Sequence, residues 1–302
     1  YSEKSMFQIA VDRLYPLFEP ERVMVVAGAE HAQVLSAQVP EIPAENFIIE
    51  PFGRNTAPAI GLAAVHLRRR DPVARMAVLT ADHFIGDTET FRRAIGSGLE
   101  LAETGWLVTL GISPTYPSTE YGYIEQAEAL DAVSGFQTYR AERFVEKPSL
   151  DKAQKMLAVG GYSWNSGMFM WQVDAVLEEM RLQMPALHKL LMEIEAAVGT
   201  SEYGQVLAEA WTGVPKQSID YGIMENARQV AVIPVEMAWK DIGSWLSLNS
   251  LVEADRDGNA VQGDVLLKDC KDLLVMGRGT RLVAAVIPVE MAWKDIGSWL
   301  SL

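Results

Sequence analysis

The 302-residue chain is 49% hydrophobic and 22% charged, a composition typical of a globular protein with a sizeable core. Its formal net charge of −14 argues against a surface for nucleic acid or anionic membrane, but it allows a nucleotide held by a local cation or a metal ion. The single cysteine, Cys270, cannot form an intrachain disulfide and suits a reducing cytoplasm. The sequence lacks a run of about 18 apolar residues, so we expect no membrane span.

The first 111 residues alternate helical patterns with short apolar runs. Helices are predicted over 5–18, 31–37, 56–70 and 89–103. Strands are predicted over 22–27, 46–50, 76–80 and 106–111. Because this alternation covers both faces of a parallel sheet with helices, the expected fold class is α/β, with a doubly wound, mostly parallel, Rossmann-like sheet.

The pattern changes after Pro117. Longer, more alternating strands are predicted over 121–126 and 136–145, and further strands over 162–171 and 230–234. Helices are predicted over 150–159, across 173–211, and over 218–228 and 244–254. A polar turn at 255–259 predicts a boundary between a large domain at 1–255 and a small β domain at 256–302. Strands of the small domain are expected at 261–268, 272–275 and 281–286.

One segment occurs twice without a change. Residues 231–248 recur at 285–302, and there is no third copy. Natural repeats diverge and usually recur several times at a regular period, so we interpret this duplication as artificial. No function is assigned to the second copy, including Asp295.

The segment FVEKP at 144–148 places an acid and a base where an apolar run ends. In a continuing strand, Glu146 and Lys147 would point to opposite faces, so both can serve one ligand only if the strand ends there. Pro148 is consistent with such an end. A solvated strand end is the alternative interpretation.

Two further segments follow predicted strands of the first half. Asn55 and Thr56, in GRNTAP, begin a helix whose free N–H groups suit an anion or a base edge, although both residues could simply cap that helix. Asp82, in TADH, lies where a carboxylate can bind a metal that bridges phosphates. His83 is interpreted as structural, because the chain has four histidines and one cysteine and a zinc site is not expected.

Three further segments place polar or small residues among large apolar ones. Gly122 interrupts the strand YGYIE, which indicates close approach of a ligand or backbone, or else a bulge. Asn165 and Gly167 lie in WNSGMF, where a buried Asn must bond to backbone or to ligand hydroxyls. Asp241, in WKDIGSW, is a second isolated carboxylate, or a helix cap for which Ser244 is better placed. Asp82 and Asp241 together suit Mg²⁺, which prefers oxygen ligands.

Seven motifs together resemble the mannose-1-phosphate guanylyltransferases of the sugar nucleotidyltransferase superfamily. They span roughly residues 50–245 and read EPFGRNTAPAIGLAA, LTADHFI, YGYIE, RFVEKP, YSWNSGMF, SIDYGIMENA and WKDIGSW. The resemblance implies transfer of GMP from GTP to mannose 1-phosphate, giving GDP-mannose and pyrophosphate with Mg²⁺. It also implies a homodimer and a left-handed β-helix-like small domain.

The resemblance also implies roles for individual residues. Asp82 and Asp241 correspond to the metal ligands, and Lys147 corresponds to the lysine at the sugar phosphate. Residues near the guanine base and around the mannose correspond to Asn55, Thr56, Gly122, Glu146, Asn165 and Gly167.

Two departures from the family pattern and three rival interpretations accompany the resemblance. The Gly-rich loop that cradles the triphosphate is expected upstream of Tyr1, and Glu120 stands where many relatives have Gly. If the loop were absent, turnover would be in doubt.

The alternative interpretations of the sequence are a nucleotidyltransferase for another base or sugar, a non-catalytic nucleotide-sugar-binding protein, and an unrelated α/β protein.

Overall fold

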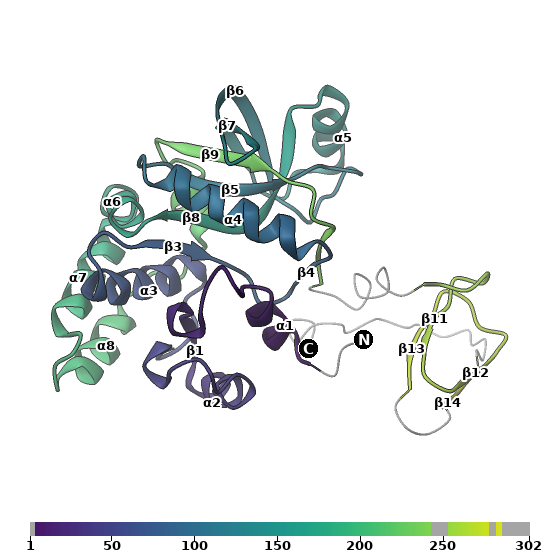
Figure 1. The fold of residues 1–302 in the computed structure, drawn as a ribbon, viewed down its shortest axis with the longest axis horizontal. Coiled ribbons are helices and arrows are strands. Elements are labelled where there is room, and N and C mark those ends of the chain that lie inside the picture. Colours follow the sequence, from purple (N-terminus) through teal and green to yellow (C-terminus); the bar gives the residue numbers. More distant parts are fainter. Residues whose placement is uncertain (1–3, 243–252, 278–281, 286–302) are drawn as a thin grey trace. The chain divides into compact units, whose positions relative to one another are not determined.

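A computed structural model describes residues 4–242, 253–277 and 282–285 (Figure 1). The chain divides into two compact units, Tyr1–Lys240 and Asp241–Leu302. The helices are α1 (Met6–Asp12), α2 (Ala29–Gln38), α3 (Thr56–Arg70), α4 (Thr88–Ala102), α5 (Leu150–Val159), α6 (Val173–Gln183), α7 (Pro185–Ala197) and α8 (Tyr203–Thr212). Shorter helical turns are Pro20–Arg22, Ala44–Asn46 and the π-helical turn Asp220–Met224.

Ten strands are described before residue 242. They are β1 (Val25–Gly28), β2 (Phe47–Glu50), β3 (Arg75–Val78), β4 (His83–Ile85), β5 (Leu107–Ile112), β6 (Tyr123–Val133), β7 (Phe136–Val145), β8 (Tyr162–Gln172), β9 (Val230–Pro234) and β10 (Trp239–Asp241). None of the helices in the described residues is long and apolar enough to cross a membrane.

The central sheet orders six strands as β3-β8-β5-β9-β7-β6. The pairings make β3, β5, β9 and β6 run one way, while β8 and β7 run the other way. Two smaller pairs, β1 with β2 and β4 with β10, complete the strands of this part. The expected α/β class is confirmed, with a mixed sheet, because β8 and β7 both run antiparallel to their neighbours.

Helices cover the two faces of the central sheet, and the large side chains of β8 alternate between those two faces. Phe169 and Trp171 pack with α3, α6, α7 and α8 in one apolar cluster. Met168 and Met170 face the opposite way and pack with α4 in a second cluster. This alternation follows from the two-residue period of a strand and gives the sheet two cores.

Local sequence explains where several elements begin and end. Ser5 and Gln8 form a capping box at the start of α1. α3 has three arginines in its last turn, where a positive charge complements the helix dipole. Strands β6 and β7 are joined by Ser134 and Gly135, both with positive φ, as a two-residue hairpin turn requires.

Some predicted elements differ from the observed ones. The helix predicted over 5–18 ends at Asp12, and that predicted over 218–228 is a five-residue π-helical turn. The helix predicted over 244–254 lies almost wholly outside the described residues, as does the second copy at 285–302.

Four strands are described beyond residue 253: β11 (Ala260–Gln262), β12 (Val265–Lys268), β13 (Leu274–Met276) and β14 (Leu282–Ala285). The single strand predicted over 261–268 is therefore two strands. β11 pairs with β13 and β12 with β14, both in parallel. Parallel pairing of consecutive coils is the pattern a β-helix needs, and the left-handed β-helix stays a prediction.

Candidate functional site

The FVEKP segment brings its acid and base to one side of the chain. β7 ends at Val145, and Lys147 has a φ of 44°, a left-handed conformation that a lysine rarely adopts. The turn leaves Lys147 Nζ 3.6 Å from Glu146 Oε1, with the Glu146 side chain 17% exposed and that of Lys147 62% exposed. The strand therefore ends before Glu146 and Lys147, which is the condition under which the sequence analysis allowed both side chains to serve one ligand.

Gly122 makes room for the Glu146 carboxylate. A Cβ built on Gly122 would lie 2.4 Å from Glu146 Oε2 and 3.5 Å from the Cβ of Asn165. Such a contact with the carboxylate is too close for any side chain. The close approach predicted at this glycine is thus made by a side chain from the neighbouring strand end.

Asn165 uses most of its hydrogen-bonding capacity within the protein. Its Oδ1 accepts from Thr109 Oγ1 and from the backbone N–H of Gly167, both at 3.2 Å. Its Nδ2 donates to Asp220 Oδ1 at 2.7 Å. Because a side-chain amide has two acceptor sites and two N–H groups, one N–H of Asn165 remains for a ligand. Gly167 itself has a φ of 69°, a left-handed conformation that favours glycine.

Asp220 is a member of this cluster that the sequence analysis did not assign. It begins the π-helical turn Asp220–Met224, and π-helical turns are frequent at functional sites. Its segment, SIDYGIMENA, is among the motifs of the resemblance, but a carboxylate in an expected helix is usually solvated. The sequence signal that could have indicated its importance is its position among three apolar residues. They are Ile219, Ile223 and Met224, which are all buried.

The carboxylates of this cluster are poorly solvated and repel one another. Burial and, secondly, the negative charge of Asp220 raise the pKa of Glu146, while Lys147 opposes that shift. Burial also raises the pKa of Asp220, against the hydrogen bond from Asn165. Two carboxylates and one lysine suit a ligand that offers both hydroxyl donors and an anion. We call Glu146, Lys147, Asn165 and Asp220 the acid–base cluster.

A group of aromatic side chains includes the sequence neighbours of Asn165 and Gly122. Trp164, the neighbour of Asn165, makes edge contacts with Tyr116 and with Tyr121, the neighbour of Gly122. Tyr121 also contacts Trp239 edge-on, with ring centroids 5.3 Å apart. The indole N–H of Trp164 is buried without a hydrogen-bond partner in the described residues.

The GRNTAP segment is bonded to the chain just before Asp220. The Ile219 N–H donates to Thr56 Oγ1 at 2.9 Å, while backbone bonds join Arg54 and Ala57 to Gln217. Asn55 adopts a φ of 69° and accepts from the Thr56 N–H at 2.8 Å, as a cap of α3. Both Asn55 and Thr56 are exposed, so the capping interpretation is observed and their outer faces remain accessible.

The turn that carries Asp82 is held by a buried arginine. Arg13 donates to the backbone carbonyls of Thr80 and His83, at 3.0 and 2.6 Å. Burial lowers the pKa of Arg13 to about 10, with Asp82 opposing the shift. His83 is buried and accepts from Trp239 Nε1 at 3.1 Å, consistent with its structural interpretation. Asp82 itself is exposed.

Asp241 is the last residue of β10, and β10 pairs with β4, the strand that follows Asp82. No group of three or more His, Cys, Asp or Glu side chains is arranged for a metal ion within residues 4–242, 253–277 and 282–285. Magnesium ions are commonly bound by one or two carboxylates together with substrate phosphates and water.

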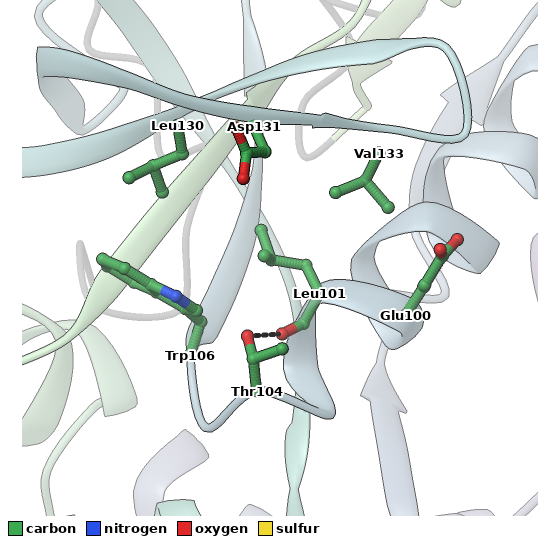
Figure 2. Close-up of a pocket in the computed structure, with 7 residues that line it drawn as sticks. All are labelled: Glu100, Leu101, Thr104, Trp106, Leu130, Asp131 and Val133. Atoms are coloured by element: carbon green, nitrogen blue, oxygen red, sulfur yellow. Dashed lines mark hydrogen bonds between the residues drawn. The ribbon is translucent and has the colours of Figure 1, made fainter.

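A cavity of about 320 Å³ lies away from these segments, between α4, the start of β5 and β6 (Figure 2). Its walls include Leu101, Trp106 and Val133, and its charged lining residues are Glu100 and Asp131. Since both charges are negative, this cavity does not suit a phosphate or a nucleotide. It contains none of the predicted site residues.

Comparison with known proteins places these motifs in context. A model of the nucleotidyl transferase family matches residues 1–258. A mannose-1-phosphate guanylyltransferase of Salmonella montevideo is 37% identical over 287 residues, covering 94% of this chain and 60% of that protein. The chain spans about 60% of the length of the first curated relatives that it matches.

Two solved structures are similar along most of the chain. The crystal structure of mannose-1-phosphate geranyltransferase from Thermus thermophilus has a TM-score of 0.79 and 35% identity, covering 94% of this chain and 80% of that one. The crystal structure of mannose-6-phosphate isomerase from Helicobacter pylori has a TM-score of 0.66 and 28% identity, covering 80% of this chain and 92% of that one.

Proposed function

Since the chain belongs to the nucleotidyl transferase family, we propose that it transfers GMP from GTP to mannose 1-phosphate, giving GDP-mannose and pyrophosphate. The observation that carries this proposal is the acid–base cluster, where Glu146 and Lys147 reach one side of a strand end. The names of the guanylyltransferase relatives support the same substrates.

The chemistry needs positioning and charge neutralisation rather than a protein base. A phosphate oxygen of mannose 1-phosphate attacks the α-phosphorus of GTP in line. The bond from the α-phosphorus to the oxygen bridging the β-phosphate breaks, and pyrophosphate leaves. A sugar phosphate is already ionised at neutral pH, so no proton has to be removed. Such transfers depend on alignment and electrostatic stabilisation.

Lys147 is proposed to hold the phosphate of the sugar. Its ammonium is exposed and faces the same side as Glu146, so it can offset the charge of the attacking phosphate. Glu146 accepts from mannose hydroxyls, Asn165 donates its remaining N–H, and the backbone at Gly122 and Gly167 allows close approach. Carboxylate and amide groups read hydroxyls because they accept and donate in fixed directions.

Asn55 and Thr56 are proposed to lie near the guanine base. Asn55 Oδ1 accepts from a backbone N–H, which leaves its Nδ2 group to donate to a base edge. Thr56 Oγ1 accepts from Ile219, so its hydroxyl proton remains available. The segment is thus fixed by its own bonds and still offers donors.

Asp82 and Asp241 would hold Mg²⁺ through carboxylate oxygens. When bound, such an ion neutralises charge on the α-phosphate and the leaving pyrophosphate. The hard oxygen donors of both residues fit that ion, and Arg13 fixes the turn that presents Asp82. We also propose assembly as a homodimer, which the family resemblance implies, and a cytoplasmic location, which the single cysteine suits. The domain boundary at 255–256 is likewise a proposal.

The proposal is tested by pyrophosphate release with GTP, mannose 1-phosphate and Mg²⁺. Release is expected from the wild type and should fall at least about 100-fold in Asp241→Ala and Lys147→Ala, losses typical of removed electrostatic stabilisation. Asp151→Ala, which removes an exposed carboxylate on α5, serves as the matched control and should retain activity. dTTP, UTP and glucose 1-phosphate in the same assay test other bases and another sugar. Binding of GDP-mannose without release would instead indicate a non-catalytic protein.

A further inference from the structure

Asp220 has no assigned part in the reaction, yet it makes the shortest hydrogen bond of the acid–base cluster to Asn165. The 2.7 Å bond from Asn165 Nδ2 is charge-assisted when Asp220 is ionised. Removing the acceptor would leave a poorly solvated amide N–H without a partner.

Asp220 also determines the orientation of the Asn165 side-chain amide. The Gly167 N–H requires an oxygen in front of it, and a carboxylate at 220 requires an N–H. Both demands are met by one orientation of the amide, with Oδ1 toward Gly167 and Nδ2 toward Asp220. The 3.2 Å contact from Gly167 is the longer of the two, so Asp220 is the stronger constraint.

The backbone holds Asp220 firmly for this task. The Ile219 N–H is bonded to Thr56 Oγ1, and Ile223 and Met224, at the other end of the turn, are buried in the apolar core. Gly222 packs against Met184, whose sulfur would lie 2.6 Å from an added Cβ. The π-helical turn is thus anchored at both ends.

We propose that Asp220 is a positioning residue for the sugar phosphate: it fixes the Asn165 amide so that the one unused N–H points to a hydroxyl of the substrate. This inference rests on the proposed function. The charges of Asp220, Lys147 and Glu225 all act on the pKa of Glu146. Lys147 also acts on the pKa of Asp220, and Asp220 acts on that of Glu225. The negative charge of Asp220 also acts on Glu146, the other hydroxyl acceptor.

The test compares Asp220→Ala, Asp220→Asn and Glu225→Gln with the wild type. In Asp220→Ala, the KM for mannose 1-phosphate should rise about 10- to 100-fold, from the loss of one charge-assisted bond, while the KM for GTP stays within about twofold. Asp220→Asn can still offer an oxygen to Asn165, so it should recover much of that loss. Glu225→Gln removes a charge next to Asp220 without that bond, and it should resemble the wild type.

A pH profile separates positioning from a general loss of structure. Because Asp220 raises the pKa of Glu146, its replacement by Asn should lower that pKa. If ionised Glu146 is the hydroxyl acceptor, the acid limb of kcat/KM for mannose 1-phosphate moves to lower pH in Asp220→Asn. A purely structural defect would lower the curve without moving the limb.

Three outcomes would overturn the inference. They are an unchanged KM in Asp220→Ala, an equal rise for GTP and mannose 1-phosphate, and an effect of Glu225→Gln as large as that of Asp220→Ala. Wild-type protein that neither releases pyrophosphate nor binds mannose 1-phosphate by calorimetry would overturn the proposed function, and this inference with it. Wild-type turnover together with an unaffected Asp220→Ala variant would overturn the inference alone.

Discussion

At the scale of single residues, the absence of a side chain at Gly122 allows the Glu146 carboxylate to lie close to its backbone. Its Cα faces the Glu146 carboxylate, and an added Cβ would approach Oε2 to 2.4 Å. We therefore expect Gly122→Ala to displace Glu146 and to raise the KM for mannose 1-phosphate about 10- to 100-fold, comparable to losing one hydrogen bond to a charged group. Steady-state kinetics with the sugar phosphate varied at saturating GTP measure this.

Gly96 provides the matched control for that substitution. It lies within α4, where an added Cβ meets nothing within 4 Å. Gly96→Ala should leave both KM values unchanged and should stabilise the protein by up to about 1 kcal/mol, because alanine favours a helix. A Gly122→Ala variant with wild-type kinetics would contradict the role given to Glu146.

Individual site residues were predictable where their type and place in the chain already limit their use. The end of β7 after Val145 follows from Pro148 and the charges before it, and the capping by Asn55 was one of two stated alternatives. Asp220 was not predictable in this way, because its importance lies in contacts with Asn165, 55 residues earlier in the chain. Periodicity shows which face of an element is apolar but not which distant amide meets it.

At the scale of elements, α3 and α8 are joined by His66 and Tyr203. His66 Nε2 lies 2.7 Å from the Tyr203 hydroxyl, and burial followed by the charge of Arg70 lowers the pKa of His66 to about 4. The unfolded chain therefore binds a proton more readily than the folded chain between pH 6.5 and about 4. Stability is highest above this window and is lost as pH falls through it.

We expect His66→Gln, which keeps an acceptor for Tyr203, to lack this pH dependence. The free energy of unfolding of the wild type, relative to the variant, should fall by about 3 kcal/mol between about pH 7.5 and pH 4. Urea unfolding at both pH values measures the difference. The same slope in wild type and variant would show that His66 titrates normally in the folded state.

Element prediction succeeded where the local pattern was long and failed where it was short. The bounds predicted for α3, β7, α5 and β9 agree with the structure, since caps, glycines and turn residues mark them. β4 and β10 have three residues each, too few for a period to appear, and tertiary pairing alone defines them. The antiparallel entry of β8 is likewise invisible locally, because direction depends on how the chain returns.

At the scale of the whole molecule, the two apolar clusters share one sheet. Leu177 belongs to the cluster around α3 and α6, and Ile95 to the cluster around α4; both are buried. Leu177→Ala and Ile95→Ala should each destabilise the protein by about 2–5 kcal/mol. Because different neighbours surround them, the double variant should lose the sum to within about 0.5 kcal/mol.

Urea unfolding followed by circular dichroism and by tryptophan fluorescence checks this expectation. The two signals should change together in every variant, since β8 contributes side chains to both clusters. Separate transitions, or a double variant far from the sum, would mean that the two faces of the sheet unfold independently.

The bonds between residues 54–57 and 217–219 have a consequence for the order of events in the proposed site. The backbone that we propose to lie beside the nucleotide and the turn that carries Asp220 are held by the same three hydrogen bonds. A ligand that stiffens one segment also reduces the freedom of the other. Such linkage is reciprocal, so each substrate would tighten the binding of the second by the same factor, whichever arrives first.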